Sequence, residues 1–267
     1  MTNIQIIDNA KVQDESKIWR YMDFPKFLDL LTTSQLAMPI ASMMEDPYEG
    51  DIGTATAARR WKSQKDLGAP SYWLVADQNR QRRTAARLRD CTYISCWNAF
   101  EHESAAMWKI YGSDGGIAIT STWGRLQESL STDMTVFGGR VHYLDYEQDP
   151  IETATHTDDF FFKRSSFDFE KEVRIISHAN GSDDYLAGTS NDVTWERVAK
   201  IDLDLNVLVD QIYINPTLGG WVRESVERVI EQFGHQWDVV QSRLYTPREE
   251  HYLWTHELTD GRDSQPG

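Results

Sequence analysis

Cysteine is scarce, since Cys91 and Cys96 are the only two in a chain of 267 residues, and this excludes a disulfide framework. If 91–97 forms one strand, the two thiols point to opposite faces about 16 Å apart, which is beyond disulfide reach. We therefore expect a reducing, cytoplasmic setting. Long apolar runs are also missing, and residues 1–8 lack the basic flank and apolar core of a signal peptide. These absences predict a soluble protein without a membrane partner.

Several motifs that mark nucleotide, hydrolase and metal sites are absent. The sequence has no phosphate-binding Gly-x-x-x-x-Gly-Lys loop, no Gly-x-Gly-x-x-Gly turn and no Gly-x-Ser-x-Gly elbow. His102-Glu103 is not followed by a second histidine at zincin spacing, and the seven histidines are scattered without cysteine partners. No bound metal is indicated by these patterns.

Positive charge is in deficit, because 27 Lys and Arg face 42 Asp and Glu, for a net charge of −15. Such a surface repels bulk nucleic acid and anionic membranes and suits a protein partner with a basic face. One basic cluster stands out, at Arg80, Arg82, Arg83, Arg87 and Arg89. It is more typical of the solvated face of a helix than of a binding patch, although a nucleic-acid partner reached through a local patch stays open.

Hydrophobic patterning predicts a mixed α+β fold in which strands predominate in the middle of the chain. We expect a single domain over 17–245, a flexible segment over 1–16 and a tail over 246–267. Asp23 and Pro25 predict the start of a helix that runs to Thr33. The other expected helices are 54–89, 104–111, 124–131 and 222–233, and the expected strands are 18–22, 36–40, 91–97, 116–121, 136–146, 167–176, 198–203, 207–214 and 239–244.

The segment Phe167–Ile176, with the sequence Phe-Asp-Phe-Glu-Lys-Glu-Val-Arg-Ile-Ile, places two carboxylates two residues apart in an expected strand. The period of two puts Glu170 and Glu172 on the same face, where each opposes ionisation of the other. One interpretation is an edge strand with a solvated acidic face. The other is a Glu-x-Glu site that faces a cation or a hydroxyl-rich ligand.

Several segments together resemble the bacterial and phage domain-of-unknown-function family 2971. They span almost the whole chain and are Trp19-Arg-Tyr21, Met44-Glu-Asp-Pro-Tyr-Glu49, Tyr93-Ile-Ser-Cys-Trp97, Ala106-Met-Trp-Lys-Ile-Tyr-Gly112, Phe169-Glu-Lys-Glu-Val-Arg-Ile175-Ile176 and Ile212-Tyr-Ile-Asn-Pro216. That family carries no activity to transfer, but its phage context implies a role in phage–host conflict.

The chain is also similar, more distantly, to ADP-ribosyltransferases of the Arg-Ser-Glu type, whose arginine strand, serine strand and Glu-x-Glu strand occur in that order. This resemblance implies a split sheet, with Arg20 on the diphosphate of NAD, Ser95 positioning the glutamate, Glu172 as the catalytic carboxylate and Glu170 on the substrate side. The serine strand here reads Ser-Cys-Trp, where the family has Ser-Thr-Ser.

Four further residues are candidates for the same ligand. Tyr21 follows Arg20, and Glu49 lies in a turn whose Asp-Pro start favours a rigid cap but leaves the carboxylate free to line a cleft. Trp108 and Tyr111 are three apart on one helical face and either stack on nicotinamide or pack in the core.

Three functions are therefore compared. The first is an enzyme that cleaves NAD and transfers ADP-ribose to a protein, a nucleic acid or water. The second is a non-catalytic module that binds a nucleotide or a protein in the same cleft, as an inhibitor or a sensor. The third is a Mg²⁺-dependent nuclease that uses Asp46, Glu49, Glu170 and Glu172, and it requires at least three of these carboxylates around one point.

Overall fold

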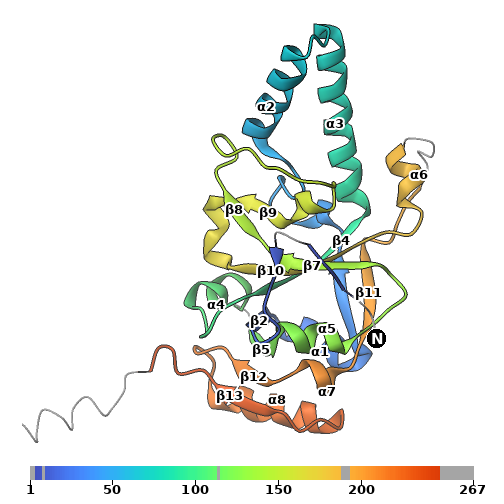
Figure 1. Ribbon diagram of the computed structural model, residues 1–267. Helices are drawn as coiled ribbons and strands as arrows, with labels where there is room; N and C mark the ends of the chain where they lie inside the picture. The colour runs from blue at the N-terminus through green and yellow to red at the C-terminus, as the bar shows by residue number, and fades with distance from the viewer. Residues whose placement is uncertain (1–3, 8–9, 113–114, 188–192, 247–267) are drawn as a thin grey trace, which may run out of the picture.

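The computed structural model describes residues 4–7, 10–112, 115–187 and 193–246, and its centre is an eight-stranded sheet in the order β1-β7-β10-β4-β2-β5-β12-β13 (Figure 1). Only its outermost pairs, β1 with β7 and β12 with β13, are parallel. The strands are β1 Gln5–Ile6, β2 Lys17–Met22, β4 Thr92–Asn98, β5 Ile117–Thr122, β7 Val136–Arg140, β10 Glu172–His178, β12 Gln211–Ile214 and β13 Asp238–Gln241. The expected single α+β domain with a mixed, mostly antiparallel sheet is confirmed.

Two small sheets flank the large one. The first has the order β3-β11-β6, and the second pairs β8 with β9 in parallel. Their strands are β3 Gln35–Pro39, β6 Leu130–Ser131, β8 His142–Leu144, β9 Phe162–Arg164 and β11 Val198–Leu203. Ile40, the residue after β3, joins the β3-β11-β6 sheet to the large one through an isolated bridge with Tyr93 on β4.

The helices pack around the sheets. They are α1 Phe24–Thr33, α2 Gly53–Asp66, α3 Ser71–Cys91, α4 Ala105–Tyr111, α5 Trp123–Ser129, α6 Ser182–Ala187, α7 Leu205–Leu208 and α8 Gly220–Gln232, with 3₁₀ turns η2 Ala41–Met43, η3 Asp158–Phe161 and η4 Ser165–Glu170. The largest hydrophobic cluster joins Phe27, Leu126 and Val226 of three helices to Ile119 and Ile175 of the sheet. Burying each such side chain contributes about 1.5–3 kcal/mol.

Local sequence explains how α1 begins and ends. The side chain of Asp23 accepts a hydrogen bond from the backbone N–H of Lys26 at 2.8 Å, and Pro25 occupies the first turn, as expected. Ser34 closes the helix in the left-handed conformation. Among the described residues, no helix is both long enough and apolar enough to cross a bilayer.

The large sheet is split between β2 and β4. These strands pair only at Trp19 and Asn98, whereas β2 pairs with β5 over six residues and β4 pairs with β10 over seven. Beyond Trp19 the two strands diverge, and the gap between them leaves room for a ligand. The split positions the candidate site.

Several expected boundaries are wrong. The expected helix 54–89 is two antiparallel helices, because Gly68 adopts a positive φ of 85° and Pro70 precedes α3. The segment expected to be flexible contributes β1, which pairs with β7. The 207–214 strand begins only at Gln211, since α7 takes its first part. The 136–146 strand is divided into β7 and β8. Apart from Thr246, the expected tail lies outside the described residues.

The two long helices α2 and α3 form a hairpin that projects from one end of the molecule (Figure 1). The hairpin is joined to the body by the foot of α3, which runs directly into β4. We refer to residues 53–91 as the helical hairpin.

Candidate functional site

A cavity of about 740 Å³ opens where β2 and β4 diverge, and we call it the central cavity. Its volume is in the range of sites for small molecules and nucleotides. Seven of the eight candidate residues line it, and they come from five separate parts of the chain: Arg20, Tyr21, Glu49, Ser95, Tyr111, Glu170 and Glu172. The fold thus brings together side chains that are up to 152 positions apart in the sequence, from Arg20 to Glu172.

Arg20 extends from β2 across the split. Its Nη1 donates to Oγ of Ser95 on β4 at 3.0 Å, and its Nη2 donates to the carbonyl oxygen of Ala37 on β3 at 3.3 Å. The guanidinium lies 5.5 Å from the ring centre of Trp97. Burial lowers the pKa of Arg20 to about 10, so the side chain is charged at neutral pH.

In the described part of the chain, no carboxylate neutralises this cation. Among the residues that the structure describes, none lies within ion-pair distance of the Arg20 guanidinium, whose partners are a hydroxyl and a carbonyl. Arg20 is half-buried, and a charge that loses part of its solvation without gaining a counter-ion is costly. The central cavity therefore favours a ligand that brings negative charge to Arg20.

Glu170 and Glu172 reach the cavity by a different route from the expected one. The expected strand is wrong over its first half: residues 165–170 form the 3₁₀ turn η4, Lys171 adopts the left-handed conformation with φ of 45°, and β10 begins only at Glu172. Alternation along a strand therefore does not relate the two glutamates. The reversal at Lys171 directs both carboxylates into the same cavity.

Both carboxylates converge with Glu49 on one ammonium group. Nζ of Lys163 lies 2.7 Å from Glu170, 3.4 Å from Glu172 and 3.5 Å from Glu49. These residues are nearly inaccessible to solvent. Three carboxylates thus surround one point, as the nuclease hypothesis requires, but the side chain of Lys163 occupies that point. Among the described residues, no group of three or more His, Cys, Asp or Glu side chains is arranged to hold a metal ion.

Arg174 completes the network from beneath. This side chain is fully buried, and its Nε donates to Oε1 of Glu172 at 2.7 Å. Its Nη1 donates to Oε2 of Glu49 at 2.7 Å and to the carbonyl of Phe160 at 2.8 Å. The network of Glu49, Lys163, Glu170, Glu172 and Arg174, which we call the buried ion network, therefore carries three negative and two positive groups.

The network separates the acidities of its two neighbouring glutamates. Burial alone would raise the pKa of Glu172, but the charges of Arg174 and Lys163 outweigh it and lower that pKa to about 2. Burial raises the pKa of Glu170, with Lys163 opposing and Glu172 adding to the shift. Glu172 is therefore a fixed anion at neutral pH, whereas Glu170 is the more readily protonated member of the pair.

The aromatic pair predicted to line the cleft is divided. Trp108 is 2 % exposed and packs with Trp19, Tyr21 and Met107, and its Nε1 donates to Glu103 at 2.9 Å. Its expected contact with the ligand is wrong, because α4 turns this side chain onto β2. Tyr111 is 46 % exposed at the rim of the central cavity, and its hydroxyl donates to Glu170 at 3.4 Å.

Tyr21 and Ser95 have well-defined partners. The Tyr21 hydroxyl accepts a hydrogen bond from the backbone N–H of Ser104 at 2.9 Å, and its ring meets Trp108 edge-on. Tyr21 is thus part of the cavity wall and of the core at once. Ser95 is buried, and its hydroxyl contacts Arg20. No hydrogen bond or ion pair joins Ser95 to Glu172 in the described part of the chain.

Two members of the network escaped the sequence reasoning. Arg174 lies two residues after Glu172, so the period of the strand could have placed both on one face. Lys163 gave no such signal, because it follows three phenylalanines and reads as the edge of an apolar run. Asn98 also lines the cavity, and its amide holds the carbonyl of Glu170 at 2.8 Å.

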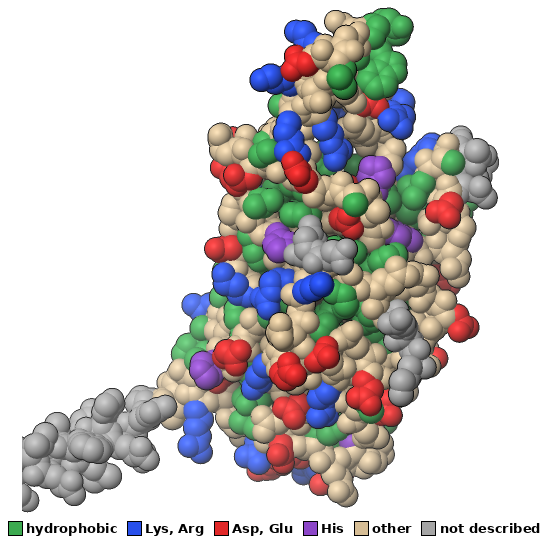
Figure 2. Space-filling model, viewed as in Figure 1, with side chains coloured by type: hydrophobic (Ala, Val, Ile, Leu, Met, Phe, Trp, Pro, Cys, Tyr) green, Lys and Arg blue, Asp and Glu red, His purple; other side chains and the backbone are tan. Residues whose placement is uncertain are grey.

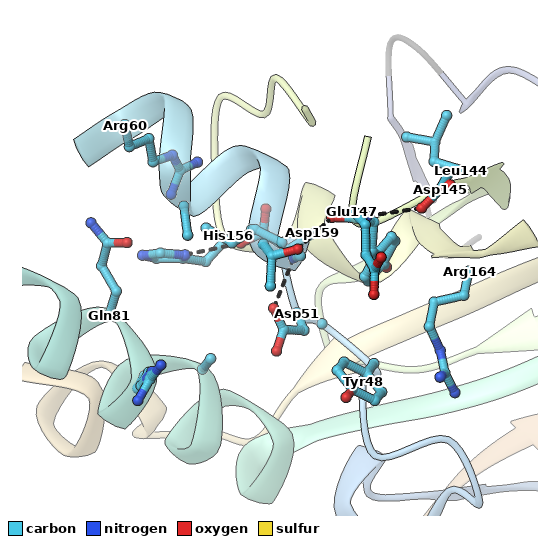
Figure 3. A pocket seen from close by; sticks show the side chains of 18 of the residues that line it. Tyr48, Asp51, Arg60, Gln81, Leu144, Asp145, Glu147, His156, Asp159 and Arg164 are labelled. Atoms are coloured by element: carbon cyan, nitrogen blue, oxygen red, sulfur yellow. Dashed lines mark hydrogen bonds and ion pairs between the residues drawn. The ribbon is translucent and has the colours of Figure 1, made fainter. Parts of the chain in front are cut away.

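A second cavity, of about 560 Å³, lies at the foot of the helical hairpin (Figure 3). Arg60, Gln81 and His156 line it on the side of the hairpin, and Tyr48 and Arg164 line it on the opposite side. We call it the hairpin cavity. Arg164 forms an ion pair with Asp46 at 2.8 Å and lies over the ring of Tyr48.

The two cavities share a wall. Asp46 and Glu49 line the central cavity, whereas Tyr48 and Asp51 line the hairpin cavity. Likewise, Lys163 lines the central cavity and the next residue, Arg164, lines the hairpin cavity.

Comparison with models of known families, with curated proteins and with solved structures gives no match for this chain.

Proposed function

We propose that the central cavity binds NAD and that the protein is an ADP-ribosyltransferase-like enzyme, which cleaves the bond between ribose and nicotinamide. One observation carries the proposal: Arg20, Ser95 and Glu172 line a single cavity, in which Arg20 is a half-buried cation without an acidic partner among the described residues. The resemblance to transferases of the Arg-Ser-Glu type names the same three residues.

The diphosphate of NAD suits Arg20. A guanidinium presents its N–H groups as a fork that fits phosphate oxygens, and the contacts to Ser95 and Ala37 hold that fork in place. Binding a doubly negative group would replace the solvation that Arg20 loses on burial. Ser95 acts in this arrangement by orienting the arginine, since its hydroxyl is bonded to Arg20.

Glu172 supplies the negative charge that the reaction needs. When the glycosidic bond breaks, its electron pair leaves with nicotinamide and positive charge develops on the ribose. An ionised carboxylate beside the ribose stabilises that charge, and the low pKa of Glu172 keeps it ionised over the physiological range. The freed C1′ carbon then bonds to an oxygen or nitrogen of the acceptor, which loses a proton.

Glu170 and Tyr111 are placed for the acceptor and the leaving group. The raised pKa of Glu170 suits a group that takes the acceptor's proton. Tyr111 at the rim offers an exposed ring on which nicotinamide can stack. Glu49 has a different part, because it balances Arg174 beneath the cavity floor.

A non-catalytic binding module is the second candidate, and the buried ion network favours it. Two cations already neutralise Glu172, through contacts of 2.7 Å to Arg174 and 3.4 Å to Lys163. A carboxylate so paired stabilises a developing charge less than a lone one does. On this account the cavity recognises an anionic nucleotide through Arg20 and performs no chemistry.

The deciding experiment is incubation with NAD labelled in the ADP-ribose part, with release of nicotinamide measured in parallel. Glu172→Gln is a suitable variant, because Arg174 keeps Glu49 and Lys163 keeps Glu170, each at 2.7 Å. The variant weakens two charge-assisted contacts, to Arg174 and Lys163, each of the kind that contributes about 1.5–3 kcal/mol, so its folding is measured in parallel. Asp77→Asn is the control: it removes another buried carboxylate, bonded to Arg80, far from the cavity.

The outcomes separate the two candidates. An enzyme releases nicotinamide, and the release falls in Glu172→Gln but not in Asp77→Asn. A binding module shows an NAD-dependent rise in melting temperature without turnover. An Arg20→Ala variant should lose that rise in either case, and a rise that persists in Arg20→Ala would remove NAD from the central cavity.

A further inference from the structure

The helical hairpin differs in charge from the rest of the protein. Residues 53–91 contain nine Lys and Arg against three Asp, for a net charge of +6. The remaining residues contain 18 Lys and Arg against 39 Asp and Glu, for a net charge of −21. Figure 2 shows basic side chains along the projecting hairpin, whereas acidic side chains are frequent on the body below it. A solvated helix would need no such separation.

Few of these cations are neutralised. Arg80 pairs with Asp77 inside the hairpin, and Arg59 pairs with Glu152 outside it. Four exposed cations, at Lys62, Lys65, Arg82 and Arg83, have no carboxylate within ion-pair distance among the described residues. An acid three or four positions away often pairs with a cation on an exposed helix, but Lys65, Arg82 and Arg83 have none at that spacing. The surface is therefore suited to an anionic polymer.

Two aromatic rings stand in solvent at the far end of the hairpin. Tyr72 is 78 % exposed and Trp73 is 44 % exposed, both in the first turn of α3. Folding alone gives no reason to expose two large rings beside cations. Aromatic faces next to a basic track are the means by which proteins hold single-stranded nucleic acid, since unpaired bases stack on the rings.

The basic track leads to the candidate site. Arg82 lines the hairpin cavity at the foot of the hairpin, as does Arg60 (Figure 3). The opposite wall of that cavity includes Tyr48 and Arg164, and residues next to them in the chain, Glu49 and Lys163, line the central cavity. Helix α3, with 21 residues, is about 30 Å long. A strand bound along it would end at the hairpin cavity, whose wall is shared with the central cavity.

We propose that the helical hairpin binds a single-stranded nucleic acid and presents it to the central cavity. The phosphates lie against Lys62, Lys65, Arg82 and Arg83, and bases stack on Tyr72 and Trp73. The binding stands on the hairpin alone. The further role of this strand as acceptor of ADP-ribose rests on the proposed function, and there an oxygen or nitrogen of the strand bonds to C1′ of the ribose, losing a proton as nicotinamide leaves.

Binding is tested by fluorescence anisotropy with the full chain and labelled 20-nucleotide strands of mixed sequence, one DNA and one RNA. If four cations contact phosphates, affinity for a single strand falls about 50-fold between 50 and 200 mM salt. In Arg82→Ala/Arg83→Ala that fall shrinks to about 7-fold. These side chains are exposed, so the variant should fold normally. Trp73→Ala lowers affinity at least about 5-fold.

The matched control removes two arginines elsewhere. Arg223→Ala/Arg228→Ala on α8 takes away the same charge at the opposite end of the molecule and should leave affinity and salt dependence unchanged. An equal loss in this control, or no binding at 50 mM salt, overturns the proposal. Competition by polyglutamate as strong as that by the unlabelled strand also overturns it and assigns the hairpin to an acidic protein.

The acceptor role has its own readout. Label from NAD should appear on the DNA or the RNA strand with the parent protein, and binding of that strand should be unchanged in Glu172→Gln. Binding without nicotinamide release refutes the proposed function and leaves the hairpin assignment intact. Nicotinamide release without strand binding refutes the hairpin assignment alone.

Discussion

Replacing Arg174 should lower the free energy of unfolding more than replacing any other single residue of the candidate site. The guanidinium is fully buried and has contacts of 2.7 Å to both Glu49 and Glu172. Substitution by methionine keeps the apolar volume of the side chain and removes the charge. Among the described residues, the one counter-ion left for Glu49 and Glu172 is then Lys163, at 3.5 and 3.4 Å, which already pairs with Glu170 at 2.7 Å.

The expected loss follows from the carboxylates left behind. Breaking a buried ion pair by removing one partner costs about 3–5 kcal/mol, which is a large part of the 5–15 kcal/mol that stabilises a typical domain. Urea unfolding followed by circular dichroism measures it, and the midpoint should fall by more than about 1 M. A second variant, Arg174→Met/Glu49→Gln, removes one stranded charge and should recover at least about 1 kcal/mol.

Two results would refute this reasoning. A loss below about 1 kcal/mol in Arg174→Met would mean that the guanidinium is not the counter-ion of the buried carboxylates. Equal stability of Arg174→Met and the double variant would mean that Glu49 and Arg174 do not interact. Either result would also weaken the account of why Glu172 is ionised, because the low pKa of Glu172 depends on Arg174.

Three further predictions concern the surroundings of the site. Trp108→Ala should cost about 3–5 kcal/mol by leaving a cavity and leave the NAD-dependent melting shift unaltered, since Trp108 is in the core. Tyr111→Ala should leave the free energy of unfolding in urea nearly unchanged and reduce the NAD-dependent shift in melting temperature. The hydrogen bond from His156 to Asp159 raises the pKa of this histidine, so its stabilisation is present below about pH 6.5 and is lost as pH rises through the raised pKa. The melting difference between the parent and His156→Asn should therefore be larger at pH 6 than at pH 8.5, and an equal difference would reject the pair.

The sequence predicted which residues share the central cavity better than it predicted their local structure. Arg20, Ser95 and Glu172 were predicted from their order along the chain, and the central cavity contains all three. Order could carry this information because each residue lies on a strand of the same sheet, where the pairing of β2, β4 and β10 brings them side by side.

Predictions that relied on local periodicity were less successful. Glu170 and Glu172 were assigned to one strand, but the left-handed Lys171 ends η4 between them, and no residue type there signals such a turn. Trp108 and Tyr111 were assigned to one helical face, yet tertiary contacts with Tyr21 bury the first and leave the second at the rim. Lys163 was missed because only the tertiary fold reveals its contacts with Glu49, Glu170 and Glu172.

The central claim is most directly tested by measuring nicotinamide released from NAD by the parent protein and by Glu172→Gln, both shown to be folded. The account predicts release by the parent and a fall of at least about 10²-fold in the variant, with Asp77→Asn retaining the parent rate. Equal release by the parent and Glu172→Gln would contradict the assignment of Glu172 as the catalytic carboxylate.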